Sequence, residues 1–129
     1  MNYIKSLPLL LLLFFTQSAF AQASEIDSLI CKSWKTVAYE QGGKKVYQSK
    51  DQKDDRIIFY ENRNLEMITG KEKDYFTWYY DEINKQIIIT DKTTKARLKF
   101  GILKLNENEL ILESKMEDFI QIIYLVPEQ

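Results

Sequence analysis

The 129-residue sequence contains no histidine, one cysteine, two prolines and four glycines. Without histidine the chain has neither a Ser-His-Asp nor a Cys-His catalytic group, and no metal site that depends on imidazole. A single cysteine cannot form a disulfide within the chain, and we expect Cys31 to be a small buried hydrophobic residue rather than a reactive thiol. So few glycines and prolines exclude a collagen-like chain, a glycine-rich phosphate loop and a proline-rich linker.

An excess of charge of one sign is also lacking, because 18 Lys and Arg side chains stand against 19 Asp and Glu. A chain this close to neutral lacks the electrostatic footprint expected for binding nucleic acid or an anionic membrane surface. Acidic residues do gather at Asp51, Asp54 and Asp55, but their spacing matches no calcium loop and basic residues interleave them. We therefore expect no metal and no cofactor. Because no acid is clearly placed in the expected core, we expect no enzyme.

Long hydrophobic runs are missing as well. The longest, residues 7–15, is roughly half of the ~20 residues that a membrane span needs. An A-x-A pattern at residues 19–21 follows it, as at a signal-peptide cleavage site. We predict that residues 1–21 are a signal peptide, although a second A-x-A pattern at residues 21–23 allows cleavage two residues later. A protein cleaved in this way is periplasmic or secreted and keeps no membrane span.

The remaining residues, 22–129, are enough for one small domain, and 45% of the whole chain is hydrophobic, which argues against disorder. Residues 24–31 place Ile26, Leu29 and Ile30 at helical spacing and predict one short helix. After this segment the hydrophobic period changes from 3.6 to 2, which is typical of strands.

Eight short apolar or alternating runs follow, separated by turns that contain Gly, Asn and Asp. They occupy residues 33–40, 56–60, 65–69, 75–81, 86–90, 95–105, 109–116 and 119–126. Their short connections require antiparallel pairing, and closing the sheet removes its two exposed edges. We predict an all-β fold, an eight-stranded antiparallel up-and-down barrel behind a short N-terminal helix, with a two-sheet sandwich as the alternative. The charged stretch at residues 44–55 is predicted to be a surface loop, with room for an extra strand at residues 45–47.

The alternation predicts which side chains point into the barrel, and Leu110 and Leu112 are among them because Glu109 and Glu113 take the opposite face. We predict five of them as the wall of a ligand cavity: Met67, Trp78, Tyr80, Phe100 and Tyr124. The same rings could instead pack against one another in a filled core. Eight strands leave an interior just wide enough for side chains or for one small ligand, so the sequence leaves both alternatives open.

Four segments carry a resemblance to a known family. They are a short helix leading into Trp34, a turn of the form Phe59-x-x-Asn62, a hairpin at residues 78–89 (WYYDEINKQIII) and a hairpin at residues 102–112 (ILKLNENELIL). In this order they resemble the lipocalin-like domains of exported bacterial proteins, over nearly the whole cleaved chain. Two features depart from the lipocalin pattern: a lysine replaces the glycine two residues before the tryptophan, and the last strand has no arginine.

The resemblance implies a lipocalin-like barrel that carries a small hydrophobic molecule and is not an enzyme. We expect a monomer, and we expect Trp34 to be a core residue. The alternative is a protein–protein interaction module with a filled barrel core, which would use strand edges and the outward Tyr75 and Tyr79. A cavity of about 300 Å³ or more would favour binding of a small ligand, whereas a filled interior would favour interaction with a partner protein.

Overall fold

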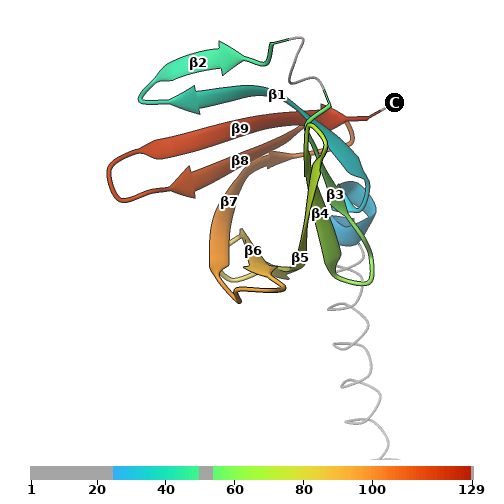
Figure 1. The fold of residues 1–129 in the computed structure, drawn as a ribbon. Coiled ribbons are helices and arrows are strands. Elements are labelled where there is room, and N and C mark those ends of the chain that lie inside the picture. Colours follow the sequence, from blue (N-terminus) through green and yellow to red (C-terminus); the bar gives the residue numbers. More distant parts are fainter. Residues whose placement is uncertain (1–24, 50–53, 129) are drawn as a thin grey trace, which may run out of the picture.

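The computed structural model describes residues 25–49 and 54–128 (Figure 1). A helix over residues 25–30 is followed by nine strands. The strands are β1 (Ser33–Gln41), β2 (Lys44–Tyr47), β3 (Arg56–Phe59), β4 (Asn64–Thr69), β5 (Glu72–Asp81), β6 (Gln86–Asp91), β7 (Arg97–Leu105), β8 (Leu110–Lys115) and β9 (Ile120–Pro127). The predicted signal peptide with its cleavage site, and Asp51, lie outside the described residues.

Eight of the strands form a closed antiparallel barrel. From β3 to β9 each strand pairs with the next, β3 also pairs with β1, and pairing of β1 with β9 closes the ring. This confirms the predicted up-and-down barrel and its short N-terminal helix, and it excludes the sandwich. The extra strand predicted at residues 45–47 is β2. It pairs with the second half of β1, whereas β3 pairs with the first residues of β1, and it lies away from β3 and β4 (Figure 1).

The helix covers one end of the barrel, which we call the closed end. Trp34 enters the core directly after the helix and is 0% exposed. Its indole N–H donates a hydrogen bond of 2.9 Å to the carbonyl of Ile30. On the other side, both Arg63 guanidinium NH2 groups donate to the Asp27 carboxylate at 2.9 Å. These bonds fix the helix across the barrel, and the prediction that Trp34 is a core residue is confirmed.

Alternation predicted the inward faces of β4, β5, β7 and β8 correctly. The buried apolar side chains on these strands are Leu65, Phe76, Trp78, Phe100, Leu110 and Leu112. On β5, Tyr75 and Tyr79 point outward and are exposed, as predicted. Polar residues occupy most of the opposite positions on these strands, so the two-residue period identifies the buried face.

The inward face predicted for β9 is wrong. Ile123 and Leu125 are the buried residues, and Tyr124 lies on the outer surface. There the Lys45 ammonium nitrogen of β2 lies 3.9 Å from the centre of the Tyr124 ring. The prediction failed because residues 122–126 are all apolar, so that alternation gives no phase for this strand. Contact with β2 explains why an apolar ring can also occupy the outer face.

Candidate functional site

A cleft of about 170 Å³ opens at the end of the barrel away from the helix, which we call the open end. Its apolar lining comes from β1, β3, β4, β7 and β9: Tyr39, Ile57, Met67, Ile68, Leu98, Phe100 and Ile123. Polar groups of Thr36, Asp55, Arg56 and Thr69 border the same cleft. An apolar hollow with a few polar groups at its border is the usual form of a small-molecule site.

The carboxylate beside the cleft is engaged in holding the rim together. Asp55 accepts a hydrogen bond of 3.0 Å from the Gly70 N–H and one of 3.4 Å from the Gln48 side-chain amide. Its backbone carbonyl accepts the Thr36 N–H at 3.3 Å. These bonds join the segment before β3 to β1 and to the β4–β5 turn. The cleft therefore offers a ligand mainly hydrocarbon surface.

Two of the five predicted wall residues meet in this cleft. Met67 from β4 and Phe100 from β7 both line it. Tyr80 packs against the core but is not part of the lining, and Tyr124 is on the outer surface. Trp78 is buried at the closed end, away from the cleft.

Protein groups surround the Trp78 ring. Its indole N–H donates to the Tyr60 carbonyl at 3.0 Å, and its ring meets Phe59 edge-on with 5.3 Å between ring centres. The Arg63 guanidinium carbon lies 4.5 Å from the centre of the indole ring. Trp78 therefore packs against protein groups at the closed end and does not face the cleft, where the predicted ligand contact would have placed it.

The predicted wall did not include five of the apolar residues that line the cleft: Tyr39, Ile57, Ile68, Leu98 and Ile123. Ile57 belongs to an apolar run with no alternation, and Ile123 was assigned to the wrong face of its strand. Tyr39 points inward because a β-bulge between Thr36 and Ala38 shifts the phase of β1. No residue in this part of the sequence, such as a glycine, indicates that the strand contains a bulge.

The volume of the cleft limits what it can hold. It lies below the roughly 300 Å³ of typical small-molecule pockets, but slightly above the roughly 150 Å³ apolar cavity that can take up benzene. The interior toward the closed end is filled, since Trp34, Ile87, Ile89 and Leu110 are at most 1% exposed. The open end therefore has room for one ring-sized apolar molecule, not for a long chain or a fused ring system.

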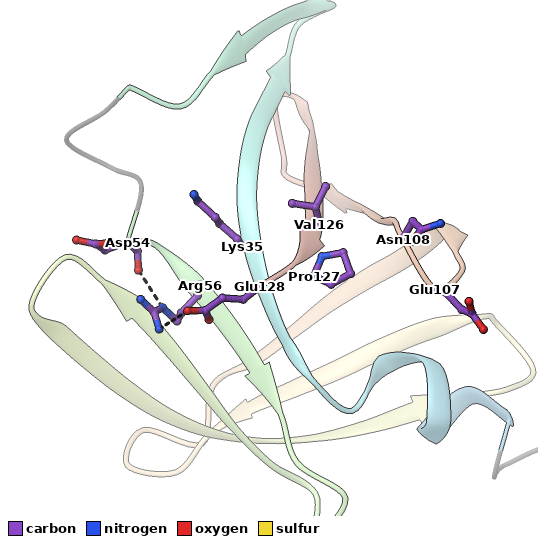
Figure 2. A pocket seen from close by; sticks show the side chains of 8 residues that line it. All are labelled: Lys35, Asp54, Arg56, Glu107, Asn108, Val126, Pro127 and Glu128. Carbon is purple, nitrogen blue, oxygen red and sulfur yellow. Dashed lines mark hydrogen bonds and ion pairs between the residues drawn. The ribbon is translucent and has the colours of Figure 1, made fainter.

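A larger hollow of about 740 Å³ lies on the outer surface between the start of β3, the end of β9 and the β7–β8 turn (Figure 2). Arg56 within it already forms a 2.8 Å ion pair with Glu128. Figure 2 shows Lys35 and Glu107 pointing in different directions. The charged groups of this hollow do not converge on a common point where they could hold a ligand. The open-end cleft is therefore the better candidate for a binding site.

The thiol of Cys31 packs against the core near the helix. Its pKa is raised to about 11, mainly by burial and next by the charge of Asp27, whereas the charge of Arg63 acts in the opposite direction. A thiol with this pKa is protonated at neutral pH and is a poor nucleophile and metal ligand.

Within residues 25–49 and 54–128, no three acidic or cysteine side chains are grouped so that they could share a metal ion. The same residues include no helix with the length and apolar character of a membrane span. No protein family that was compared matches this chain, and no similar curated protein or solved structure was found.

Proposed function

We propose that this protein is an exported, lipocalin-like binding protein without catalytic activity, which takes one small apolar molecule into the open end of its barrel. The observation that carries the proposal is the apolar cleft formed by side chains from five strands. Its volume points to a single aromatic or alicyclic ring. The protein would act as a monomer and without a cofactor.

The acid–base chemistry of the chain supports binding rather than catalysis. The chain has no histidine to transfer a proton near neutral pH. The pKa of Asp81 is lowered chiefly by a hydrogen bond from the Asn84 side chain, and that of Asp91 by backbone N–H groups, first of all that of Thr94. Both carboxyl groups therefore stay ionised and stabilise the turns in which they lie, and neither is suited to donate a proton.

Titration with toluene, a ring-sized probe, followed by NMR tests the proposal. We expect saturable shifts of the methyl groups of Met67 and Ile123. Replacing Leu98 by Trp should cover the cleft and weaken toluene binding about tenfold or more, because the ring competes for the same apolar surface. Leu98 is 41% exposed, so the barrel should accept the larger side chain. Arg97→Trp, one residue earlier on the outer face, is the matched control and should bind toluene like the wild type.

Absence of any saturable shift in the folded wild-type protein would exclude the ligand proposal. Equal weakening in Leu98→Trp and Arg97→Trp would also contradict it, because only one of the two side chains borders the cleft.

A second function, docking of another protein, is favoured by a separate observation at the β8–β9 turn. Met116, Phe119 and Ile120 are exposed there beside a shallow hollow of about 640 Å³. The charged side chains that line this hollow, Glu117 among them, are all acidic. Such a surface fits a basic segment with apolar side chains. A lysine-rich amphipathic peptide should bind to the wild type and at least several-fold less to Phe119→Ser; equal binding would exclude this surface.

A further inference from the structure

A hollow of about 390 Å³ lies on the outer face of the barrel, beside the β5–β6 turn. Residues from this turn and from β6, β7 and β8 line it: Asn84, Lys85, Gln86, Lys99, Gly101, Ile102, Glu113 and Lys115. Gly101 pairs with Gln86 on one side and with Glu113 on the other, so it stands between the two neighbouring strands that line the hollow. The open-end cleft and this hollow have no lining residue in common.

Gly101 forms part of the floor of this hollow, and neither its backbone nor its surroundings require a glycine. Its φ is not positive, in contrast to those of Gly42, Gly43 and Gly70. An added Cβ would meet only the Glu113 carbonyl oxygen, at 3.9 Å, which is an ordinary contact. Glycine within a strand lowers stability and often marks a place that another group approaches closely. The missing side chain leaves the sheet surface open to the hollow.

Three lysines and one carboxylate border the hollow: Lys85, Lys99, Lys115 and Glu113. In the part of the chain that the structure describes, the ion pairs are Arg56–Glu128, Arg63–Asp27 and Lys104–Glu109, so these lysines belong to none of them.

Two acidic groups limit the positive charge. Glu113 offsets one lysine, and Lys99 also acts on Asp81, whose pKa is lowered mainly by Asn84 and to a smaller extent by Lys99. The Asn84 amide donates to Asp81 at 2.8 Å and is therefore engaged in the turn. The hollow keeps an excess of ammonium groups around an open floor, with the Gln86 side chain as a further polar group.

We propose that this hollow binds the phosphate of a phosphomonoester over Gly101, between the three lysine side chains. Ammonium groups suit a compact, multiply charged oxyanion, because each acts as a point charge with several donors and no fixed plane. The volume exceeds what one phosphate fills and leaves room for the organic group that carries it. A soluble phosphorylated compound and a membrane lipid with a phosphomonoester headgroup present this same chemistry.

The test uses the full folded chain and two probes, glycerol 3-phosphate in solution and vesicles that contain phosphatidic acid. NMR titration at constant ionic strength should give saturable amide shifts centred on Gly101 and Gln86, with chloride as the reference anion. Lys85→Gln, Lys99→Gln and Lys115→Gln combined should weaken binding about tenfold or more, given the modest energy of each exposed charge. Lys71→Gln, Lys73→Gln and Lys92→Gln combined change the charge equally at another site and should leave binding unchanged.

Gly101→Val separates binding from folding. Valine favours strands and should keep or raise the melting temperature, while its methyl groups fill the floor and weaken phosphate binding. Saturable binding of either probe that depends on the three lysines and on Gly101 supports the proposal, and the probe that binds identifies the source of the phosphate. The proposal is overturned if neither probe binds, if both triple variants behave alike, or if Gly101→Val binds like the wild type. Toluene binding at the open end should be the same in every variant, so the two proposals fail independently.

Discussion

Replacing Trp78 by alanine should destabilise the barrel strongly and leave the open-end cleft intact. The side chain is only 1% exposed and belongs to the core at the closed end. Truncating such a buried aromatic ring costs about 3–5 kcal/mol of unfolding free energy, since apolar contact is lost and a cavity remains. The edge-on contact with Phe59 and the cover from Arg63 disappear together with the ring.

A second substitution separates the hydrogen bond from the packing. Trp78→Phe keeps an aromatic ring but removes the indole N–H that donates to the Tyr60 carbonyl at 3.0 Å. Loss of this partner should account for about 1–3 kcal/mol, because the carbonyl is left without its donor. The control is Tyr79→Ala on the same strand. That side chain is 45% exposed on the opposite face, and removing it should cost about 1 kcal/mol or less.

Urea denaturation followed by circular dichroism measures these differences, provided that the slope m is unchanged between variants. Toluene titration of each folded variant, under conditions where it remains native, should give the wild-type affinity. Equal stability of Trp78→Ala and Tyr79→Ala would refute the register of β5. Loss of toluene binding in folded Trp78→Phe would refute the separation of the closed end from the cleft and would return Trp78 to the ligand wall.

Trp34→Ala should also cost about 3–5 kcal/mol, and an unchanged urea midpoint would show that Trp34 is not a core residue. Asp27→Asn should reduce stability by only about 0.5–1 kcal/mol in urea melts, because its ion pair with Arg63 is partly exposed; a loss of several kcal/mol would contradict this. Alkylation of Cys31 in the folded protein should still accelerate tenfold per pH unit above pH 9, since its pKa is raised to about 11; a plateau near pH 9 would argue against burial. Intact mass of the protein from its native host should show loss of residues 1–21, and retention of residues 7–15 would overturn the predicted export.

Much of the barrel could be predicted from the sequence because local patterns determine it. Short turns force neighbouring strands to pair antiparallel, and a polar residue opposite each apolar one fixes which face is buried. On β5 and β8 this was sufficient: Trp78, Leu110 and Leu112 are buried, whereas Tyr79 is exposed. The position of Trp34 directly after the helix likewise identified a core residue before its bond to Ile30 was known.

The candidate site was predictable only in part, because it depends on how strands meet across the barrel. Met67 and Phe100 lie on strands with clear alternation, and both line the cleft. Tyr124 lies on a wholly apolar strand, and its outward position was decided by pairing with β1 and contact with β2. The size of the cleft was also beyond the sequence, since it depends on how far side chains from several strands fill one space.

The sequence by itself determined the strand order, the antiparallel pairing and the near-neutral overall charge, because each depends on neighbouring residues or on a sum over the chain. Only the tertiary structure decided between the closed barrel and the sandwich, through the pairing of β1 with β9, and only it placed the bulge that turns Tyr39 inward. It also gathered Lys85, Lys99 and Lys115 around one hollow, although they are well separated along the chain. A net charge averages over such groups, whereas the local field depends on their distances in space, and those distances are set by long-range strand pairing.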